Sequence, residues 1–280
     1  MLEMRQVAKV YRTEQVETHA LRSLDLHVRE GEFVAVTGPS GSGKTTFLNI
    51  AGLLETFTEG DYLLDGQNVR GMSDDDRSRL RNQKIGFIFQ GFNLIPDLNL
   101  FDNVDVPLRY RGMPAAERKQ RIEDALARVG LGARMKHYPA ELSGGQQQRT
   151  AIARALAGSP RLLLADEPTG NLDSQMARGV MELLEEINRQ GTTIIMVTHD
   201  PELAARAQRN VHIVDGMATD LSVEPALIRG TQRLRVSRPP GPPQTASRPP
   251  HGGPGPTLRS QACSATTSPS RCAASSATRR

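Results

Sequence analysis

Nine consecutive residues near the start of the chain have the types and spacing of a phosphate-binding loop. Their glycines let the backbone turn tightly enough for N–H groups to point at phosphate oxygens, and a following helix adds the partial positive charge of its N-terminus. A lysine here can neutralise the β- and γ-phosphates, and the next hydroxyl can bind Mg²⁺. The alternative, a glycine-rich turn without a ligand, is disfavoured by the predicted strand before the loop and helix after it. The nucleotide-binding candidates are Gly38, Pro39, Ser40, Gly41, Ser42, Gly43, Lys44, Thr45 and Thr46, with Lys44 also a catalytic candidate and Thr45 a metal ligand.

An acidic pair, Asp166 and Glu167, follows the aliphatic run 162–165. In a parallel sheet the carboxyl ends of the strands face the ligand crevice. There Asp166 can hold Mg²⁺ through water. Glu167 can accept a proton from the attacking water or orient it, because a glutamate is ionised at neutral pH. Strands also end in acidic residues that are only solvated. The pair therefore indicates a catalytic site only in combination with the phosphate loop.

A third segment opens a predicted helix over 147–157 and reads Leu142-Ser143-Gly144-Gly145-Gln146. The serine and the glutamine have the spacing of a capping box. That does not explain the two glycines, which weaken a helix and are needed where a backbone is approached closely. A helix N-terminus without bulk is a second phosphate-binding surface, so Ser143, Gly144, Gly145 and Gln146 are predicted to contact a nucleotide. The two phosphate-binding surfaces can meet across a two-fold dimer.

These motifs need a fold that places them at the ends of strands. Short aliphatic runs alternate with amphipathic helical patterns, which predicts an α/β core with an antiparallel β subdomain and an inserted helical subdomain at about 91–160. The phosphate loop between a strand and a helix of this core makes a P-loop NTPase (RecA-like) core the expected type. The expected strands are 32–37, 85–89, 162–165 and 192–197, the expected helices are 44–54, 115–129, 147–157 and 175–189, and hairpins are expected within 1–30 and 60–70. The helix 175–189 is expected to bury Met176, Val180, Leu184 and Ile187.

The composition divides the chain into a body and a tail. Nine of the 35 basic residues and nine of the 18 prolines lie in 229–280, while all 31 acidic residues lie at or before Glu224. The body, 1–228, is therefore net negative, which argues against direct nucleic-acid binding. The tail is predicted to be disordered, and its composition also fits an out-of-frame reading of a GC-rich gene. Both cysteines lie in the tail, and no run is long enough for a membrane helix, so a cytoplasmic location is expected.

Taken together, the phosphate loop, the acidic pair and the LSGGQ segment resemble ABC transporter ATP-binding subunits over residues 1 to about 220. The resemblance implies an ATP- and Mg²⁺-dependent ATPase that works as a homodimer. It also implies that Gln90 is a catalytic and metal-sensing glutamine, that His199 is a catalytic switch histidine, and that Asn171–Asp173 is a dimer-communication loop. Tyr11 stands where the family stacks an aromatic ring on adenine. Alone, each has a plainer interpretation, as a solvated loop residue, a core histidine or a packed strand aromatic.

Four segments, Phe87–Gln90, Phe92–Pro96, Leu142–Arg149 and Ala165–Asp173, are similar to the branch that contains macrolide-export and lipoprotein-release ATPases. This similarity implies a transmembrane permease subunit on a separate chain, with the ATPase bound peripherally at the cytoplasmic face of the cell membrane. Two alternatives remain open. One is an ABC-type ATPase that regulates remodelling of the cell envelope through a membrane partner, and the other is a nucleic-acid or ribosome ATPase.

Overall fold

The computed structural model describes residues 1–13 and 16–221, and the tail 229–280 lies outside the described residues. The elements in chain order are β1 Leu2–Arg12, β2 Glu17–Val28, β3 Phe33–Thr37, α1 Lys44–Ala51, β4 Glu59–Leu64, β5 Gln67–Asn68, α2 Asp74–Lys84, β6 Ile85–Phe89, α3 Leu100–Tyr110, α4 Ala115–Arg128, η1 Gly132–Arg134, η2 Pro139–Glu141, α5 Gly144–Leu156, β7 Leu162–Asp166, α6 Ser174–Arg189, β8 Thr193–Val197, α7 Pro201–Ala204, β9 Arg209–Val214 and β10 Met217–Asp220.

The central sheet has six strands in the order β10-β9-β3-β8-β7-β6. All neighbouring pairs are parallel except β9 with β10. Its inner strands are uninterrupted apolar runs because both faces are covered. In β8, Ile194 and Met196 join one core cluster, while Ile195 and Val197 join the other. The expected α/β core is confirmed, and the parallel arrangement brings the carboxyl ends of β3, β6, β7 and β8 to one edge.

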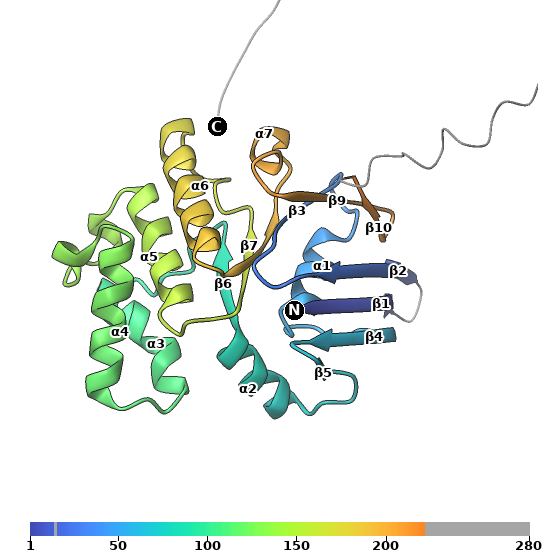
Figure 1. Ribbon diagram of the computed structural model, residues 1–280, viewed down its shortest axis with the longest axis horizontal. Helices are drawn as coiled ribbons and strands as arrows, with labels where there is room; N and C mark the ends of the chain where they lie inside the picture. Colours follow the sequence, from blue (N-terminus) through green and yellow to red (C-terminus); the bar gives the residue numbers. More distant parts are fainter. Residues whose placement is uncertain (14–15, 222–280) are drawn as a thin grey trace, which may run out of the picture. The chain divides into compact units, whose positions relative to one another are not determined.

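A second, four-stranded sheet has the order β2-β1-β4-β5 and is antiparallel throughout. The turn between β4 and β5 is Asp65-Gly66, with both residues at positive φ, as a tight hairpin requires. Figure 1 shows β1, β2 and β4 on one side of the parallel strands and α3, α4 and α5 on the other. The hairpins expected within 1–30 and 60–70 are confirmed, and they form one sheet.

The helices begin and end near the predicted positions. Ser143 caps α5 with both bonds of the capping box, and Asp200 caps α7 by accepting from the amides of Glu202 and Leu203. Helix α1 ends at Ala51, earlier than predicted, because the chain turns at Gly52 and the next residue, Leu53, has a left-handed φ of 57°. A helix cannot continue through that conformation.

One expected core residue is wrong. Val180, Leu184 and Ile187 of α6 are buried as predicted, but Met176 is 37% exposed. Its side chain lies against the N-terminal turn of α5, where a Cβ added at Gly145 would be 2.8 Å from Met176 Sδ. The first turn of α6 therefore packs against the glycines of α5, and not in the main core.

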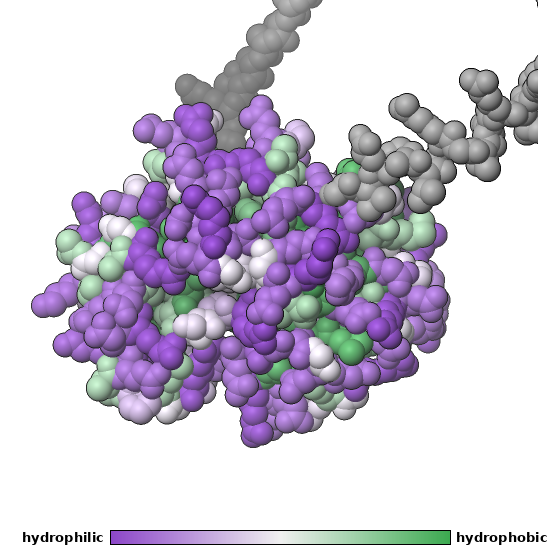
Figure 2. Space-filling model, viewed as in Figure 1, coloured by the Kyte–Doolittle hydropathy of each residue, from purple (hydrophilic) through white to green (hydrophobic). Residues whose placement is uncertain are grey.

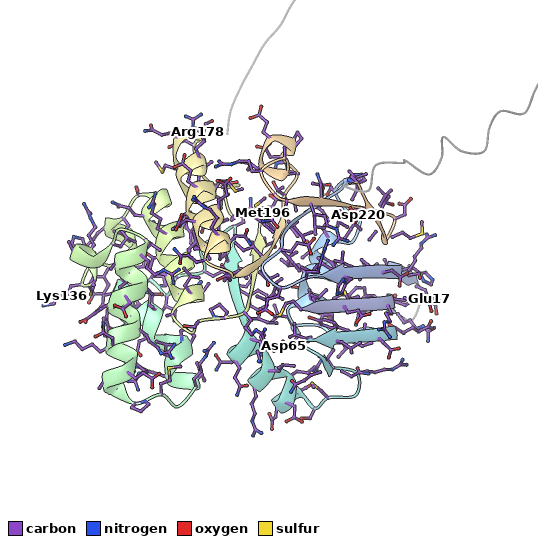
Figure 3. The ribbon with its side chains drawn as sticks, in the orientation of Figure 1. Glu17, Asp65, Lys136, Arg178, Met196 and Asp220 are labelled. Carbon is purple, nitrogen blue, oxygen red and sulfur yellow. The ribbon has the colours of Figure 1, made fainter. Side chains whose placement is uncertain are left out.

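A charge network joins the two sheets at the Asp65 turn, which Figure 3 labels. The Asp65 carboxylate accepts from Lys84 Nζ at 2.8 Å and from Arg161 Nη1 at 2.6 Å, and these two cations lower the pKa of Asp65. Lys84 ends α2, and Arg161 directly precedes β7. The network thus anchors the start of the strand that carries Asp166 at its other end.

The face shown in Figure 2 is covered mainly by hydrophilic residues, with small apolar areas between them. Across residues 1–13 and 16–221, no helix has both the length and the apolar character needed to cross a bilayer.

Candidate active site

The phosphate-loop candidates lie between β3 and α1, at the carboxyl edge of the parallel sheet. The loop folds tightly because three of its glycines, Gly38, Gly41 and Gly43, have φ between 77° and 146°. A Cβ at Gly38 would lie 2.1 Å from the Ile213 carbonyl oxygen, and one at Gly43 would lie 2.4 Å from that of Ala20. The loop is thus pressed between β9 and β2, with no room for side chains at these two positions.

Lys44 points back over its own loop. Its Nζ donates to the carbonyl oxygens of Gly38 and Pro39, both at 2.8 Å, so the ammonium is held over the loop. The buried Ser42 hydroxyl has no hydrogen-bond partner among the described residues. A buried hydroxyl without a partner in the chain is unusual, and it leaves this hydroxyl able to bond a phosphate oxygen. Together with the ammonium, it fits the phosphates of a nucleotide.

We expect Gly43→Ala to damage the loop more than Gly41→Ala. Both glycines have positive φ, but a Cβ at Gly43 meets backbone, whereas one at Gly41 meets nothing within 4 Å. Left-handed strain alone costs about 1–2 kcal/mol, so Gly41→Ala should lower Tm by roughly 2–8 °C. Gly43→Ala should lower Tm further and abolish nucleotide binding. Thermal scans and titration with a fluorescent ATP analogue check this, and equal losses in the two variants would contradict the close approach of Ala20.

The acidic pair stands at the end of β7. Burial raises the pKa of Asp166, the neighbouring Glu167 carboxylate raises it further, and the Lys44 ammonium lowers it. Two carboxylates beside one ammonium favour a further cation. In the described part of the chain, no group of three His, Cys, Asp or Glu residues could hold a metal alone. Mg²⁺ does not need one, because it takes one or two protein oxygens and completes its shell with phosphates and water. Asp166 and the exposed hydroxyl residue Thr45 fit that donor set.

Glu167 is held in a conformation that aims its side chain at His199. Its φ is 43°, in the left-handed region, and its amide donates to the Val197 carbonyl oxygen at the end of β8. Glu167 Oε1 lies 2.9 Å from His199 Nδ1. A strained backbone at a carboxylate is typical of functional sites, where side-chain direction matters more than local stability. The structure thus brings the predicted base and the predicted switch histidine into direct contact.

The N-terminus of α5 presents the LSGGQ residues. Ser143 N donates to Gln146 Oε1 at 3.1 Å, and Gln146 N donates to Ser143 Oγ at 3.4 Å. Met176 packs so closely on Gly145 that a larger residue would not fit there, which explains this glycine without a ligand. A Cβ at Gly144 would meet the side chains of Leu172 and Phe92 only at ordinary contact distance. Within the described residues, no hydrogen bond or ion pair joins 38–45 to 142–146. The two predicted phosphate-binding segments therefore lie on different elements, the β3–α1 loop and the N-terminus of α5, without a direct polar contact.

Gln90 directly follows β6, and its side chain is turned toward Asn171. Gln90 Nε2 donates to Asn171 Oδ1 at 3.4 Å, and Asn171 Nδ2 donates to the Gln90 carbonyl oxygen at 3.0 Å. A Cβ at Gly170 would lie 2.6 Å from Gln90 Nε2. The predicted metal-sensing residue is thus tied to the predicted dimer-communication loop. Its roles as catalytic residue and metal ligand remain predictions.

Tyr11 lies in the β1–β2 pair, opposite Thr18, and is 40% exposed. Lys9 Nζ is 4.9 Å from the centre of its ring, within cation–π range, and also pairs with Glu55 at 2.8 Å. Since Ala20 of the same strand pair approaches Gly43, the tyrosine is on the sheet that flanks the phosphate loop. Stacking of this ring on adenine remains a prediction.

One residue beside the site was not predicted from the sequence. Gln148 of α5 is fully buried, and its Nε2 donates to the Pro168 carbonyl oxygen at 2.6 Å, directly after Glu167. Its Oε1 has no partner among the described residues. The only signal in the sequence was a glutamine on the apolar side of a helix, which does not reveal what the amide contacts.

Comparison with known proteins identifies the family. Residues 21–170 match the family described as "ABC transporter", and 136–205 match one described as "AAA domain, putative AbiEii toxin, Type IV TA system". The chain is 46% identical over 216 residues to an uncharacterized ABC transporter ATP-binding protein, YknY of Bacillus subtilis (strain 168), which covers 77% of this chain and 94% of that protein. It is 45% identical over 216 residues to the macrolide export ATP-binding/permease protein MacB of Marinobacter nauticus, which covers 77% of this chain and 34% of MacB.

A solved structure agrees with these relatives. It is described as the dimeric structure of a post-hydrolysis state of the ATP-binding cassette MJ0796 bound to ADP and Pi. The match has a TM-score of 0.72 at 41% identity and covers 79% of this chain and 99% of the other. The motifs, their geometry and these matches agree: the chain belongs to the ABC transporter family, as an ATP-binding and ATP-hydrolysing subunit whose sequence matches the branch that contains MacB.

Proposed function

We propose that two copies of this chain close around two ATP molecules, each site using residues 38–45 of one copy and Ser143–Gln146 of the other. The placement of the two segments on different elements, without a direct polar contact between them, is compatible with the proposal. The dimeric arrangement described for MJ0796 supports it. An exposed helix N-terminus attracts the γ-phosphate of a nucleotide bound on the facing copy. Closure of the dimer then depends on the triphosphate, because hydrolysis removes the γ-phosphate that joins the two copies.

Mg²⁺ fits the site beside Lys44, with Thr45, Asp166 and, after a movement of its loop, Gln90 as the protein contacts. The ion neutralises charge on the β- and γ-phosphates when it is bound. Glu167 takes a proton from the attacking water, and His199, at 2.9 Å from its carboxylate, keeps that carboxylate directed toward the phosphate. The raised pKa of Asp166 supports this assignment, because an added cation would favour its ionised form.

The permease would bind in a groove of about 800 Å³ between the α2–β6 segment and α3. Its wall includes Phe87, Phe89 and Val106, and Tyr110 at its rim is 83% exposed. Aromatic and aliphatic side chains in a concave surface are typical of a site that receives a helix from a partner. The groove adjoins Asn93, three residues after Gln90, so an occupant would sense the nucleotide site. We assign it to a transmembrane permease on a separate chain, which would hold the ATPase at the cytoplasmic face of the membrane.

Export is the transport direction that the relatives favour, since MacB is described as a macrolide export protein with ATP-binding and permease parts. This chain matches only the part of MacB that amounts to 34% of its length. By contrast, it covers 94% of YknY, described as an ATP-binding protein. The alternative is a membrane partner that serves envelope remodelling without transport, and the identity of the purified partner distinguishes the two.

Affinity purification of the tagged chain from detergent-solubilised membranes of its source organism tests the partner. We expect mass spectrometry to identify a protein with predicted membrane-spanning helices, at near-equal amounts. Tyr110→Ala should reduce its recovery about tenfold, as loss of an exposed aromatic anchor does at an interface. Tyr138→Ala removes an exposed tyrosine outside the groove and serves as the matched control. Recovery of a nucleic-acid complex in place of a membrane protein, or equal effects of both variants, would contradict the assignment.

A further inference from the structure

Arg154 of α5 holds the loop that follows Gln90. Its Nη2 donates to the Phe92 carbonyl oxygen at 2.8 Å, and its Nη1 donates to that of Asn93. Burial lowers the pKa of Arg154. Across the described residues, no carboxylate lies within ion-pair distance of this guanidinium. The guanidinium is partly buried, and the two carbonyls are the acceptors that it contacts. Its two arms therefore depend on the geometry of those carbonyls.

The two carbonyls belong to residues with unusual backbones. Phe92 has φ of 62° and Asn93 has φ of 50°. Phenylalanine rarely adopts the left-handed region, because its Cβ crowds the backbone there. Inside the loop, the amide of Phe92 donates to the Phe89 carbonyl oxygen at 3.2 Å, and the amide of Asn93 donates to the Gly91 carbonyl oxygen at 2.7 Å. Arg154 contacts the loop from outside, and its two hydrogen bonds favour the left-handed backbone of Phe92 and Asn93.

The loop meets α5 at a second point. A Cβ added at Gly144 would lie 3.7 Å from Cζ of the Phe92 ring, so the ring packs beside the first turn of the helix. Arg154 stands roughly three turns further along the same helix. Because α5 is a continuous helix, a rotation of its N-terminus moves both contacts together.

On its other side, the loop is joined to the dimer-communication segment through Gln90 and Asn171, which exchange two hydrogen bonds. The chain of contacts therefore runs from α5 through the Phe92 and Asn93 carbonyls to Gln90 and on to Asn171. Hydrogen bonds make the links from Arg154 to the loop and from Gln90 to Asn171, and the backbone of 90–93 joins the two.

We propose that Arg154 is a positioning residue that makes the glutamine loop move with α5, so that Gln90 approaches the nucleotide only when the LSGGQ helix takes up its closed position. Two adjacent carbonyls need the planar, two-armed guanidinium, and a lysine ammonium would hold them less well. The proposal rests on the role assigned to Gln90 above. In this proposal, movement of α5 shifts the glutamine loop, and so does a partner bound in the groove. The wall of the groove includes both Asn93 and Arg154.

The test uses Arg154→Gln and the milder Arg154→Lys in the full chain, with Arg111→Gln as the matched control. Arg111 is also partly buried, and its two Nη atoms donate to the carbonyl oxygens of Asn82 and Gly158, away from the loop. Hydrogen exchange of the nucleotide-free protein is measured first. We expect Arg154→Gln to speed exchange in 90–93 and around Asn171 about tenfold or more, with Arg154→Lys intermediate. Arg111→Gln should speed exchange near 82 and 158 only.

ATPase kinetics complete the test. We expect Arg154→Gln to lower kcat about tenfold while the affinity for a fluorescent ATP analogue changes less than about twofold, since misplacement of a catalytic group affects turnover before binding. Unchanged exchange in 90–93 would overturn the proposal. Faster exchange with normal kcat would overturn it too, and Gln90→Ala then separates the causes. If Gln90→Ala has a low kcat, only the coupling of the loop to α5 through Arg154 is refuted. If Gln90→Ala has a normal kcat, the catalytic role of Gln90 is refuted as well.

Discussion

Glu167→Gln is expected to lower kcat for ATP hydrolysis by about 10²- to 10⁴-fold while ATP still binds. The amide keeps the size of the carboxylate and its place beside His199, but it cannot accept a proton from water. Because the triphosphate would then persist, the closed dimer should accumulate. Phosphate release measures turnover, and size-exclusion chromatography with ATP and Mg²⁺ measures the dimer.

Glu182→Gln provides the control for Glu167→Gln, since Glu182 is exposed on α6 and the change removes the same charge. It should leave both turnover and dimerisation as in the wild type. The 2.9 Å contact between Glu167 and His199 adds a sharper test. If the histidine acts through the carboxylate, adding His199→Ala to Glu167→Gln should slow turnover little further, because residues that act as a unit are not additive. Near-normal kcat in Glu167→Gln would refute the assignment of the base.

The parallel sheet was predictable because its strands are short apolar runs buried on both faces. The strand predicted at 85–89 is β6, Ile85–Phe89, and the one predicted at 162–165 ends one residue later, at Asp166. Such runs admit few alternatives once glycine, proline and charge mark their ends. The order of the strands was not predictable from the runs alone, since it depends on which crossover each helix makes.

The motifs themselves could be found from types and spacing, and the structure brings several of them together. Lys44 influences the pKa of Asp166, and Glu167 contacts His199, although they are far apart in the sequence. A parallel sheet explains this, because residues that follow different strands meet at its carboxyl edge. The order of motifs along the chain was therefore enough to predict that edge, but not which atoms touch.

The residues that escaped prediction all act through tertiary contacts. Met176 fits the apolar face of α6 by spacing, yet it packs on Gly145 at the surface. Gln148 and Arg154 lie on α5 and contact backbone carbonyls of Pro168, Phe92 and Asn93. Carbonyl acceptors carry no sequence signal, because every residue has one. Side-chain to backbone bonds between distant segments therefore need the structure.

Lys44→Ala is expected to weaken ATP binding by about 10- to 100-fold, as loss of a charge-assisted hydrogen bond does. The ammonium that Gly38 and Pro39 hold over the loop would be absent, while the loop itself should remain folded. Turnover should be undetectable at ATP concentrations that saturate the wild type. Titration with a fluorescent ATP analogue, with and without Mg²⁺, measures the affinity, and thermal scans measure the fold.

The result for Lys44 also separates a specific phosphate contact from a general effect of charge. Lys136→Ala removes the same charge from an exposed position, labelled in Figure 3, and should leave affinity and turnover unchanged. ATP should raise the Tm of the wild type and of Lys136→Ala, because a ligand that binds only the folded state stabilises it. Lys44→Ala should lose most of that rise. If it kept wild-type affinity, residues 38–45 would not be the phosphate site, and the pairing of that loop with the LSGGQ helix of a second copy would lose its basis.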